Sequence, residues 1–434
     1  MLVSGLSEAF SAWLSTAPRF AQALSFLASC PEAFVVGGTV RDLLLGRPVA
    51  DLDILVPEGA IHTGRTLARE LDVAFYVLDA ERDVCRLVLD TTTHIDITKY
   101  RLPSLQDDLQ HRDFTINALA WRVGDESYEI IDNSLGLTDL QQGIIRIVSE
   151  VSFADDPLRV LRAVRFAGAL GFTIEPHTLQ HIQQDRNLLP QISPERIRDE
   201  FLSILALPNP LAALELFVNL DLSPFSLGMD SEALAHGLKS LAILFSKTAM
   251  LIPSDRVQSL EQDWQQPLTA DRPRWLLNRL ALLLWGAVGE SDVWSTLCER
   301  LVLSGRECAH LQRIRQGLSW LSVWPCGWWR DPERIYAYYD ALDESGTDAA
   351  VFHAALLPSA SSAETRDILL SAWYEQHDRL IAPPRLLTGD DVQQLTGASG
   401  PEIGRLLKKL TLAQVRGEIT DAVQAKAWLS KQTS

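Results

Sequence analysis

Two aspartates, Asp51 and Asp53, lie in a segment where polar and apolar residues alternate, residues 51–56. This alternation predicts a strand on which both carboxylates point to one face, while Leu52 and Ile54 point into a core. Two carboxylates on one face repel each other unless a cation lies between them, so the pair suits Mg²⁺. Two such ions about 4 Å apart activate an attacking hydroxyl and stabilise a leaving pyrophosphate. A strand face that is simply solvated gives the same pattern, so the pair alone leaves both interpretations open.

A pair of glycines precedes these aspartates. The apolar run at residues 34–36 predicts a strand that ends at Gly37 and Gly38. Glycines here let backbone N–H groups approach a polyphosphate without a side chain in the way. Arg41 follows in the first turn of a predicted helix over residues 40–45, which places its guanidinium beside the same phosphates. An ordinary turn between a strand and a helix is the alternative.

Asp96 offers a third carboxylate. The alternating residues 86–89 and 95–97 predict two further strands, and Asp96 lies on the second of them. A carboxylate on a neighbouring strand can lie beside the first two, as a further metal ligand or as a base.

The block HRDFTINA, residues 111–118, predicts the start of a helix with its polar side chains on one side. Arg112 is then placed to hold phosphates, and Asp113 to accept hydrogen bonds from ribose hydroxyls. Asn117 lies on the same polar side.

A second predicted helix spans residues 153–167, where Asp156, Arg159, Arg162 and Arg165 follow one another at intervals of three. This spacing places the four on one face. A carboxylate that accepts from an exocyclic amine, beside a guanidinium that donates to ring acceptors, fits the edge of cytosine or adenine and rejects uracil and guanine. A ladder of surface ion pairs is the alternative for such a helix by itself.

The blocks GGTVRD, DLD and RDFTINA, in this order, resemble the head domain of class II tRNA nucleotidyltransferases and bacterial poly(A) polymerases. Residues 153–167 resemble the nucleobase-selecting helix of that family, with its signature Glu-Asp-x-x-Arg. Residues 193–200 resemble the next family motif, which braces that helix, and residues 386–407 resemble the family's tail. The resemblance implies an α+β fold: a head with a mixed β-sheet (1–150), then an all-α neck (151–205), body (206–380) and tail (381–434).

The resemblance also implies roles for single residues. Gly38 and Arg41 would bind the triphosphate, Asp51 and Asp53 would hold Mg²⁺, Arg112 and Asp113 would contact the nucleotide, and Asp156, Arg159, Arg162 and Arg165 would contact base or phosphate. From their positions in the same blocks, we add Gly37 and Asn117 to the nucleotide-binding residues and Asp96 to the catalytic residues. Two positions depart from the family pattern. His111 stands where an arginine is usual, and Asp155 stands where glutamate is usual.

The connection at residues 102–110 is short where complete CCA-adding members carry a longer flexible loop. That loop is associated with the switch from cytidine to adenosine addition, so its absence predicts a CC-adding enzyme that uses CTP and works alongside a separate A-adding enzyme. Complete CCA addition, which also uses ATP, A addition alone, poly(A) tailing and a non-catalytic RNA-binding protein are the alternatives. The implied acceptor is the 3′ end of tRNA, whose elbow the tail would hold.

Composition sets the outer limits of function. The chain has 434 residues and a net charge of −17, which is unusual for a protein that binds RNA. A local basic patch at Arg405, Lys408 and Lys409 offsets this charge, and tRNA contact is expected at residues 385–425. No apolar stretch approaches the length of a membrane span, and five scattered cysteines predict reduced thiols, so a cytoplasmic protein is expected.

A tract of four tryptophans at residues 320–329 has two interpretations. The rings either stack on bases or, as we expect, pack between helices.

Overall fold

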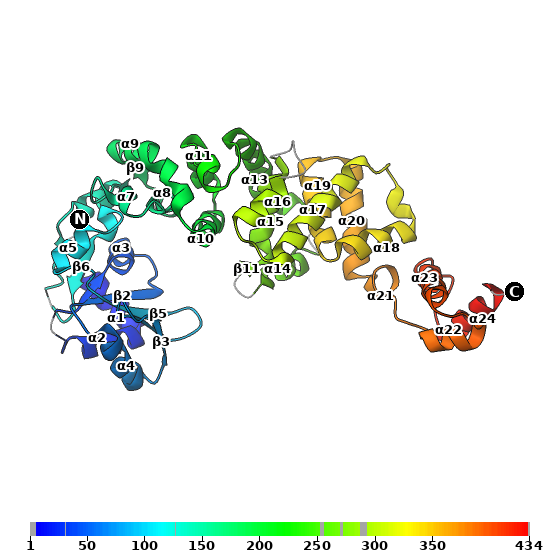
Figure 1. The fold of residues 1–434 in the computed structure, drawn as a ribbon, viewed down its shortest axis with the longest axis horizontal. Helices are drawn as coiled ribbons and strands as arrows, with labels where there is room; N and C mark the ends of the chain where they lie inside the picture. Colours follow the sequence, from blue (N-terminus) through cyan, green and yellow to red (C-terminus); the bar gives the residue numbers. More distant parts are fainter. Residues whose placement is uncertain are drawn as a thin grey trace. The chain divides into compact units, whose positions relative to one another are not determined.

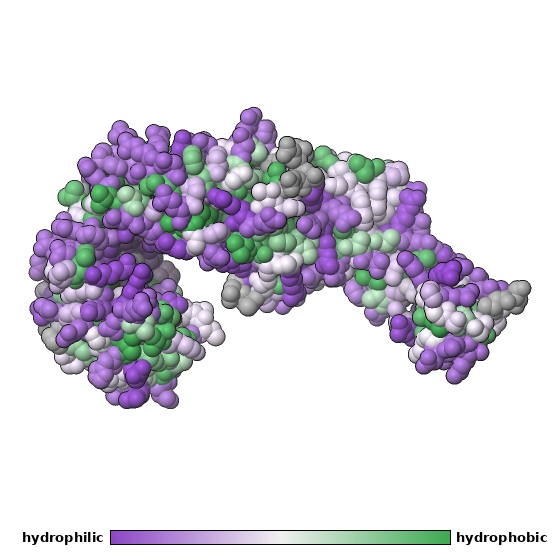
Figure 2. All heavy atoms as spheres, in the orientation of Figure 1, coloured by the Kyte–Doolittle hydropathy of each residue, from purple (hydrophilic) through white to green (hydrophobic). Residues whose placement is uncertain are grey.

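A computed structural model describes residues 6–30, 32–125, 127–251, 256–269, 272–286 and 293–432 of the chain. Residues Met1–Leu207 form one compact unit (unit 1), and Pro208–Ser434 form a second (unit 2). The predicted further division at residues 150 and 380 stays a prediction. Within the described ranges, every helix is too short or too polar to cross a lipid bilayer. Hydrophilic residues cover most of the face of unit 1 that Figure 2 shows.

Unit 1 is built on a seven-stranded sheet (Figure 1). The strand order is β3-β4-β5-β2-β1-β6-β7; β2 pairs with β5 in parallel, and the other neighbouring pairs are antiparallel. The predicted mixed sheet is therefore confirmed. The elements are α1 (Leu6–Thr16), α2 (Pro18–Leu27), β1 (Phe34–Val36), α3 (Gly38–Leu44), β2 (Asp51–Val56), α4 (Ala60–Leu71), β3 (Ala74–Asp79), β4 (Val84–Val88), β5 (His94–Lys99), α5 (Leu105–Gln110), the 3-10 turn η1 (Thr115–Asn117), β6 (Leu119–Arg122), β7 (Ile130–Asp132), α6 (Gly136–Gln142), β8 (Ile144–Ile145), α7 (Ser152–Asp155), α8 (Arg159–Leu170), β9 (Thr173–Ile174), α9 (Pro176–Asp185), η2 (Arg186–Gln191) and α10 (Pro194–Leu205).

The two faces of β2 differ as the alternation predicts. Leu52 and Ile54 are fully buried, and so are Ile95 and Ile97 on the adjacent β5. Burying a side chain of this size contributes about 2 kcal/mol, so these four fix the register of the central strands. A slip of one residue would turn the apolar side chains out and the aspartates in.

The block 111–118 does not begin a helix, which corrects the prediction. A single 3-10 turn, η1, is followed at once by β6, which pairs with β1. The Asp113 carboxylate accepts hydrogen bonds from Phe114 N (2.8 Å) and Asn117 Nδ2 (3.0 Å). Such local bonds from an aspartate compete with helix formation.

Asp156 is not on the helix that carries the three arginines, which is a second correction. Helix α7 ends at Asp155, Asp156 is extended (φ −149°, ψ 97°), and α8 begins at Arg159. The cause is Pro157, because proline disfavours the helical conformation for the residue before it. Arg159, Arg162 and Arg165 do lie on α8 at the predicted spacing.

Unit 2 is a stack of helices followed by a small C-terminal group (Figure 1). Its elements are α11 (Leu211–Asn219), α12 (Ser223–Ser226), α13 (Ser231–Leu251), α14 (Val257–Gln265), β10 (Pro267–Thr269), β11 (Arg272–Pro273), α15 (Arg274–Gly286), α16 (Val293–Arg300), α17 (Gly305–Val323), η3 (Trp328–Arg330), α18 (Pro332–Leu342), α19 (Ser345–Leu356), α20 (Ala360–Tyr374), α21 (His377–Leu380), α22 (Gly389–Thr396), α23 (Pro401–Val415) and α24 (Ala422–Gln432). The predicted helical neck, body and tail are confirmed as a mostly helical remainder, with two short strand pairs, β8 with β9 and β10 with β11, as exceptions.

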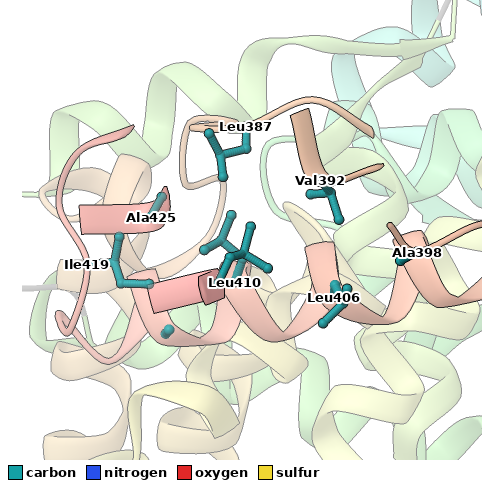
Figure 3. Close-up of a cluster of buried hydrophobic side chains, with 9 residues drawn as sticks. Leu387, Val392, Ala398, Leu406, Leu410, Ile419 and Ala425 are labelled. Atoms are coloured by element: carbon teal, nitrogen blue, oxygen red, sulfur yellow. The ribbon is translucent and has the colours of Figure 1, made fainter. Parts of the chain in front are cut away.

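The last three helices have a hydrophobic core of their own (Figure 3). Val392 of α22, Leu406 and Leu410 of α23, and Ala425 of α24 contribute to it. Packing of these faces turns the other side of α23 to solvent. That exposed side carries Arg405, Lys408 and Lys409, so the predicted basic patch exists as a surface.

Candidate active site

The carboxylates gather on one face of the central strands. Asp53 of β2 lies opposite Asp96 of β5 in the register, and Asp51 lies opposite His94. His94 Nδ1 is 2.9 Å from Asp51 Oδ1. On the other side of Asp96, Arg86 of β4 donates to both carboxylate oxygens at 2.8 Å each. The predicted trio of aspartates therefore lies together, but Asp96 already holds a bidentate partner.

Thr39 ties the glycine turn to the carboxylate strand. Its hydroxyl, which is almost fully buried, donates to Asp51 O (2.9 Å) and accepts from Asp53 N (3.0 Å). Helix α3, which starts at Gly38, is therefore bonded to the backbone on both sides of Leu52.

Gly37 brings Arg112 close to Asp53. Its φ of +68° is a conformation that favours glycine, and a Cβ at this position would lie 2.6 Å from Arg112 Nη1 and 3.8 Å from Asp53 Oδ2. Arg112 Nη1 donates to Asn117 O at 3.5 Å, and Arg112 Nη2 is 3.6 Å from Asp108 Oδ2. The Nε of Arg112 is buried and has no hydrogen-bond partner among the described residues. An orphaned guanidinium N–H beside a carboxylate cluster is suited to a phosphate oxygen.

Helix α8 joins this face through Asp113. Arg162 Nε and Nη2 donate to Asp113 Oδ2 at 2.9 and 2.7 Å. Burial by itself raises the pKa of the Asp113 carboxyl. The positive charge of Arg162 and the hydrogen bonds from Arg162, Asn117 and Phe114 N have the larger combined effect, so the pKa lies below its usual value. Asp113 is therefore ionised and holds Arg162 in place.

Arg159 and Asp156 form the adjoining edge. Arg159 donates to Ser152 Oγ (2.9 Å) and to His111 O (2.8 Å). Asp156 accepts from Arg196 of α10 at 2.8 Å, so its partner is this arginine rather than one of α8. The motif at residues 193–200 does brace α8, because Glu200 also accepts from Arg165 at 2.5 Å.

Asp53 lines a cavity of about 380 Å³ within unit 1 together with the residues around Arg112 and Arg159, whereas Asp51 and Asp96 are not among its lining residues. Its charged lining is Asp53, Arg101, Asp108, His111, Arg112, Asp113, Asp156, Arg159, Arg162 and Arg196. Five arginines against four aspartates give a polar chamber with a small positive excess on a chain whose net charge is −17. Such a lining suits a polyphosphate that carries a polar ring.

The short connection at residues 102–110 forms one wall of the cavity. It folds into α5, whose Leu109 is buried with Leu55 and Phe34 on the face of the sheet that carries Asp53. Asp108, next to it, accepts from Arg101 N at 3.0 Å. The connection is therefore a packed helix rather than an open loop.

Seven predicted residues are not in the cavity lining: Gly37, Gly38, Arg41, Asp51, Asp96, Asn117 and Arg165. Arg41 donates to Asn117 Oδ1 (2.6 Å) and to Asp42, and Arg165 pairs with Glu200. The predicted roles of these seven residues stay predictions. Sequence reasoning missed Arg86, His94, Arg101, Asp108 and Arg196 as parts of the site, although Arg101 lies two residues after the strand that carries Asp96 and Arg196 lies in the bracing motif.

The electrostatics of Asp53 fit a divalent cation. Burial raises its pKa to about 6, and the charges of Asp96 and Asp51 add to this rise, whereas Arg112 and His94 lower it in part. A cation between the carboxylates would offset both causes. Among the described residues, no three Asp, Glu, His or Cys side chains make a metal site by themselves. Phosphate oxygens of a nucleotide would have to complete the coordination, as is usual for Mg²⁺.

Comparison with known proteins decides the family. A CC-adding tRNA nucleotidyltransferase from Synechocystis sp. is 30% identical over 406 residues, which cover 92% of this chain and 93% of the relative. A second protein of that name, from Geobacter sulfurreducens, is 31% identical and covers 92% of each chain. This chain belongs to the family of tRNA nucleotidyltransferases and bacterial poly(A) polymerases. An A-adding tRNA nucleotidyltransferase from Deinococcus radiodurans is 29% identical over 92% of this nucleotidyltransferase and 95% of the relative.

The head-domain match includes Asp53 and Arg112, whereas Asp156, Arg159 and Arg162 lie between the two matched regions. The model of the poly(A) polymerase head domain matches residues 33–105 and 102–146 of the nucleotidyltransferase, and the model of a probable RNA- and SrmB-binding site of the polymerase matches residues 171–227. The CCA-adding enzyme of Bacillus stearothermophilus in complex with CTP has a TM-score of 0.70 and 26% identity, and covers 96% of this chain and 98% of its own. The nucleotidyltransferase therefore has the fold of CCA-adding enzymes.

Proposed function

We propose that this nucleotidyltransferase adds cytidine nucleotides from CTP to the 3′ end of tRNA. The observation that carries the proposal is the cavity lined by Asp53 and Arg112 of the head together with Asp156, just before α8, and Arg159 and Arg162 of α8. Metal-ligating, phosphate-binding and base-reading groups meet there in one chamber. The CC-adding names of two relatives that match over nearly the whole chain support the same reaction.

Asp51 and Asp53 would hold Mg²⁺. When bound, the metal lowers the pKa of the terminal ribose hydroxyl and neutralises the departing pyrophosphate. Arg86 holds the Asp96 carboxylate in place beside Asp53 through two hydrogen bonds. Arg112 lies close to Asp53 and would donate to a phosphate oxygen through its Nε, which the protein leaves unpaired among the described residues.

Asp156 and Arg159 would read the base. Cytosine donates from its exocyclic amine and accepts at the ring nitrogen and carbonyl. Asp156 is held by Arg196 and Arg159 is held by Ser152, so both have a fixed position before the nucleotide binds. Arg162 donates two N–H groups to Asp113 and therefore supports this edge by positioning.

The choice of two cytidines rests on α5. The position where complete CCA-adding members carry a flexible loop is here a helix anchored by Leu109 and Asp108. Because α5 is packed against the sheet, we expect the cavity to keep one shape, which suits cytidine. A separate A-adding enzyme would then add the terminal adenosine to the tRNA. The A-adding relative makes adenosine addition the second candidate.

The tail would hold the elbow of the tRNA through the exposed side of α23. Arg405, Lys408 and Lys409 lie there on consecutive turns, and positive side chains at this spacing follow a phosphate backbone.

Incorporation of labelled CTP or ATP, with Mg²⁺, into three tRNA transcripts tests the proposal. The transcripts end before the CCA, after its first cytidine, or after both cytidines. We expect CTP alone to be used and extension to stop after the second cytidine. Completion of the CC-ended transcript with ATP contradicts CC specificity, and long adenosine tails indicate a poly(A) polymerase.

A further inference from the structure

The tryptophan-rich part of unit 2 encloses a second cavity, of about 220 Å³. Its walls come from the end of α17, from η3, from α19 and from the start of α20. Trp324, Trp328 and Trp329 provide most of the aromatic surface. All of these elements belong to unit 2, so the cavity is independent of the chamber that holds Asp53.

Two residues of this cavity lining each carry a buried polar atom that has no partner among the described residues. Trp329 is 5% exposed, and its Nε1 has no hydrogen-bond partner among the described residues. The same holds for Nδ1 of His353, on α19. A buried donor without a partner is costly in free energy, and native proteins retain few of them. The other cavity has this feature as well, in Arg112 Nε.

The remaining polar groups are small and neutral. Ser361 and Thr365 of α20 line the cavity, and the exposed Cys326 lies at its edge with its Sγ 3.2 Å from Ser361 Oγ. Burial lowers the pKa of His353, so its ring is neutral, with one nitrogen that donates and one that accepts. Among the residues that the structure describes, the lining includes no carboxylate, lysine or arginine. The site therefore suits an uncharged, planar group with both donors and acceptors.

We infer that this cavity binds a nucleobase, stacked on the tryptophan rings and hydrogen-bonded by Trp329 Nε1 and His353 Nδ1. Every base offers an aromatic face to the tryptophans, and each has ring or carbonyl acceptors for the indole N–H. A cavity of about 220 Å³ has room for one ring system. The apolar side chain of Leu357 is exposed at the same cavity, beside the entering base.

The base can come from a free nucleoside or from an unstacked position of an RNA. Both supply the same ring, so the experiment separates them. The full-length protein is treated with iodoacetamide, and mass spectrometry measures the rate at which Cys326 is alkylated. Saturating CTP is present throughout, so that it fills the chamber that contains Asp53. Adenosine, cytidine or a tRNA transcript that ends before the CCA is then added. Cys30, in unit 1, is the internal control.

We expect at least about fivefold slower alkylation of Cys326 with a bound base, and no change at Cys30. Protection by a nucleoside identifies a free ligand; protection by the tRNA alone identifies an RNA base. In both cases Trp329→Phe, which keeps the ring and removes the N–H, should abolish most of the protection. Circular dichroism of that variant checks that it is folded.

Two results would overturn the inference. One is an alkylation rate of Cys326 that none of the three ligands changes, which would mean that water fills the cavity. The other is protection of Cys326 by tRNA that, in both Trp329→Phe and His353→Phe, stays within about twofold of the wild-type protection. The RNA would then cover the thiol without bonding to the unpaired nitrogen atoms. Neither result depends on nucleotide transfer, so a failure of CTP incorporation would leave this test intact.

Discussion

Asp113 and Arg162 are joined by two hydrogen bonds, at 2.9 and 2.7 Å, that connect the segment after α5 to helix α8. Asp113 is almost fully buried, whereas about a third of the Arg162 side chain is exposed. The pair therefore holds the base-reading helix against the phosphate-binding side of the cavity.

Replacing Asp113 with alanine leaves Arg162 without its partner. We expect a loss of about 2 kcal/mol in the free energy of unfolding, reduced from the value for a fully buried pair because Arg162 is partly exposed. The KM for CTP should rise, since Arg162 loses its fixed position. Urea denaturation and initial rates measure the two effects. Asp340→Ala, at an exposed aspartate of α18, is the control and should change neither.

Asp53→Ala should abolish incorporation of every nucleotide and leave tRNA binding unchanged, because the carboxylate is needed only where the metal acts. Single-turnover incorporation and a filter-binding assay measure the two properties. Glu81→Ala removes an exposed carboxylate from the turn after β3 and should retain full activity. Residual turnover of Asp53→Ala within about tenfold of the wild type is incompatible with the metal assignment.

Gly37→Ala should displace Arg112. A Cβ at residue 37 would lie 2.6 Å from Arg112 Nη1, and the φ of +68° adds strain of about 1 kcal/mol for alanine. We expect the KM for CTP to rise about tenfold or more. Gly46→Ala is the matched control, because Gly46 has φ +64° and no atom within 4 Å of a Cβ. Gly46→Ala should lower the free energy of unfolding about as much as Gly37→Ala does, and leave the KM for CTP unchanged. Equal KM values for CTP in both variants would show that Arg112 does not bind the nucleotide.

Replacing Arg405, Lys408 and Lys409 together with alanine should weaken tRNA binding and make it less dependent on salt. If each side chain neutralises one phosphate, the slope of log K against log salt falls by about 3. Binding at several salt concentrations measures this slope. The triple variant Arg82→Ala, Lys239→Ala, Arg306→Ala removes equal charge from exposed positions outside the tail. An equal change in slope for both triple variants would exclude a specific role of α23.

His310 should make unit 2 sensitive to acid. Burial, with the nearby positive charges of Arg274, Arg313 and Arg306, lowers the pKa of His310 to about 3. The unfolded chain takes up this proton near pH 6.5, so stability is complete above that pH and falls as pH decreases toward 3. The free energy of unfolding between pH 7 and pH 4 measures the loss. In His310→Gln the dependence should be weaker, whereas the exposed His62→Gln should match the wild type.

The strand-borne part of the site could be predicted from the sequence. Alternation along β2 and β5 is a local property, and it places Asp51, Asp53 and Asp96 on one face. The same reasoning failed at Asp156, where Pro157 ends the helix, and at residues 112–117, where the side chain of Asp113 bonds its own turn.

Partners that come from distant parts of the chain could not be predicted. Arg86 meets Asp96, and Arg196 meets Asp156, only after the sheet and the helices have packed. The position of Asp108 at the cavity could not be predicted either, because it depends on the packing of α5 over Leu55. The spacing of residues within one strand or helix predicts which face each side chain occupies. Contacts between side chains of different elements depend on how those elements pack in the fold.

The hydroxyl of Thr39 has a consequence for protein engineering. Since it bonds the backbone at both Asp51 and Asp53, the glycine turn, α3 and the carboxylate strand form one part with a fixed internal geometry. Residues 34–56 should therefore be transplanted together when the site is grafted onto another scaffold. A graft of the two aspartates alone would keep the ligands and lose the spacing between them.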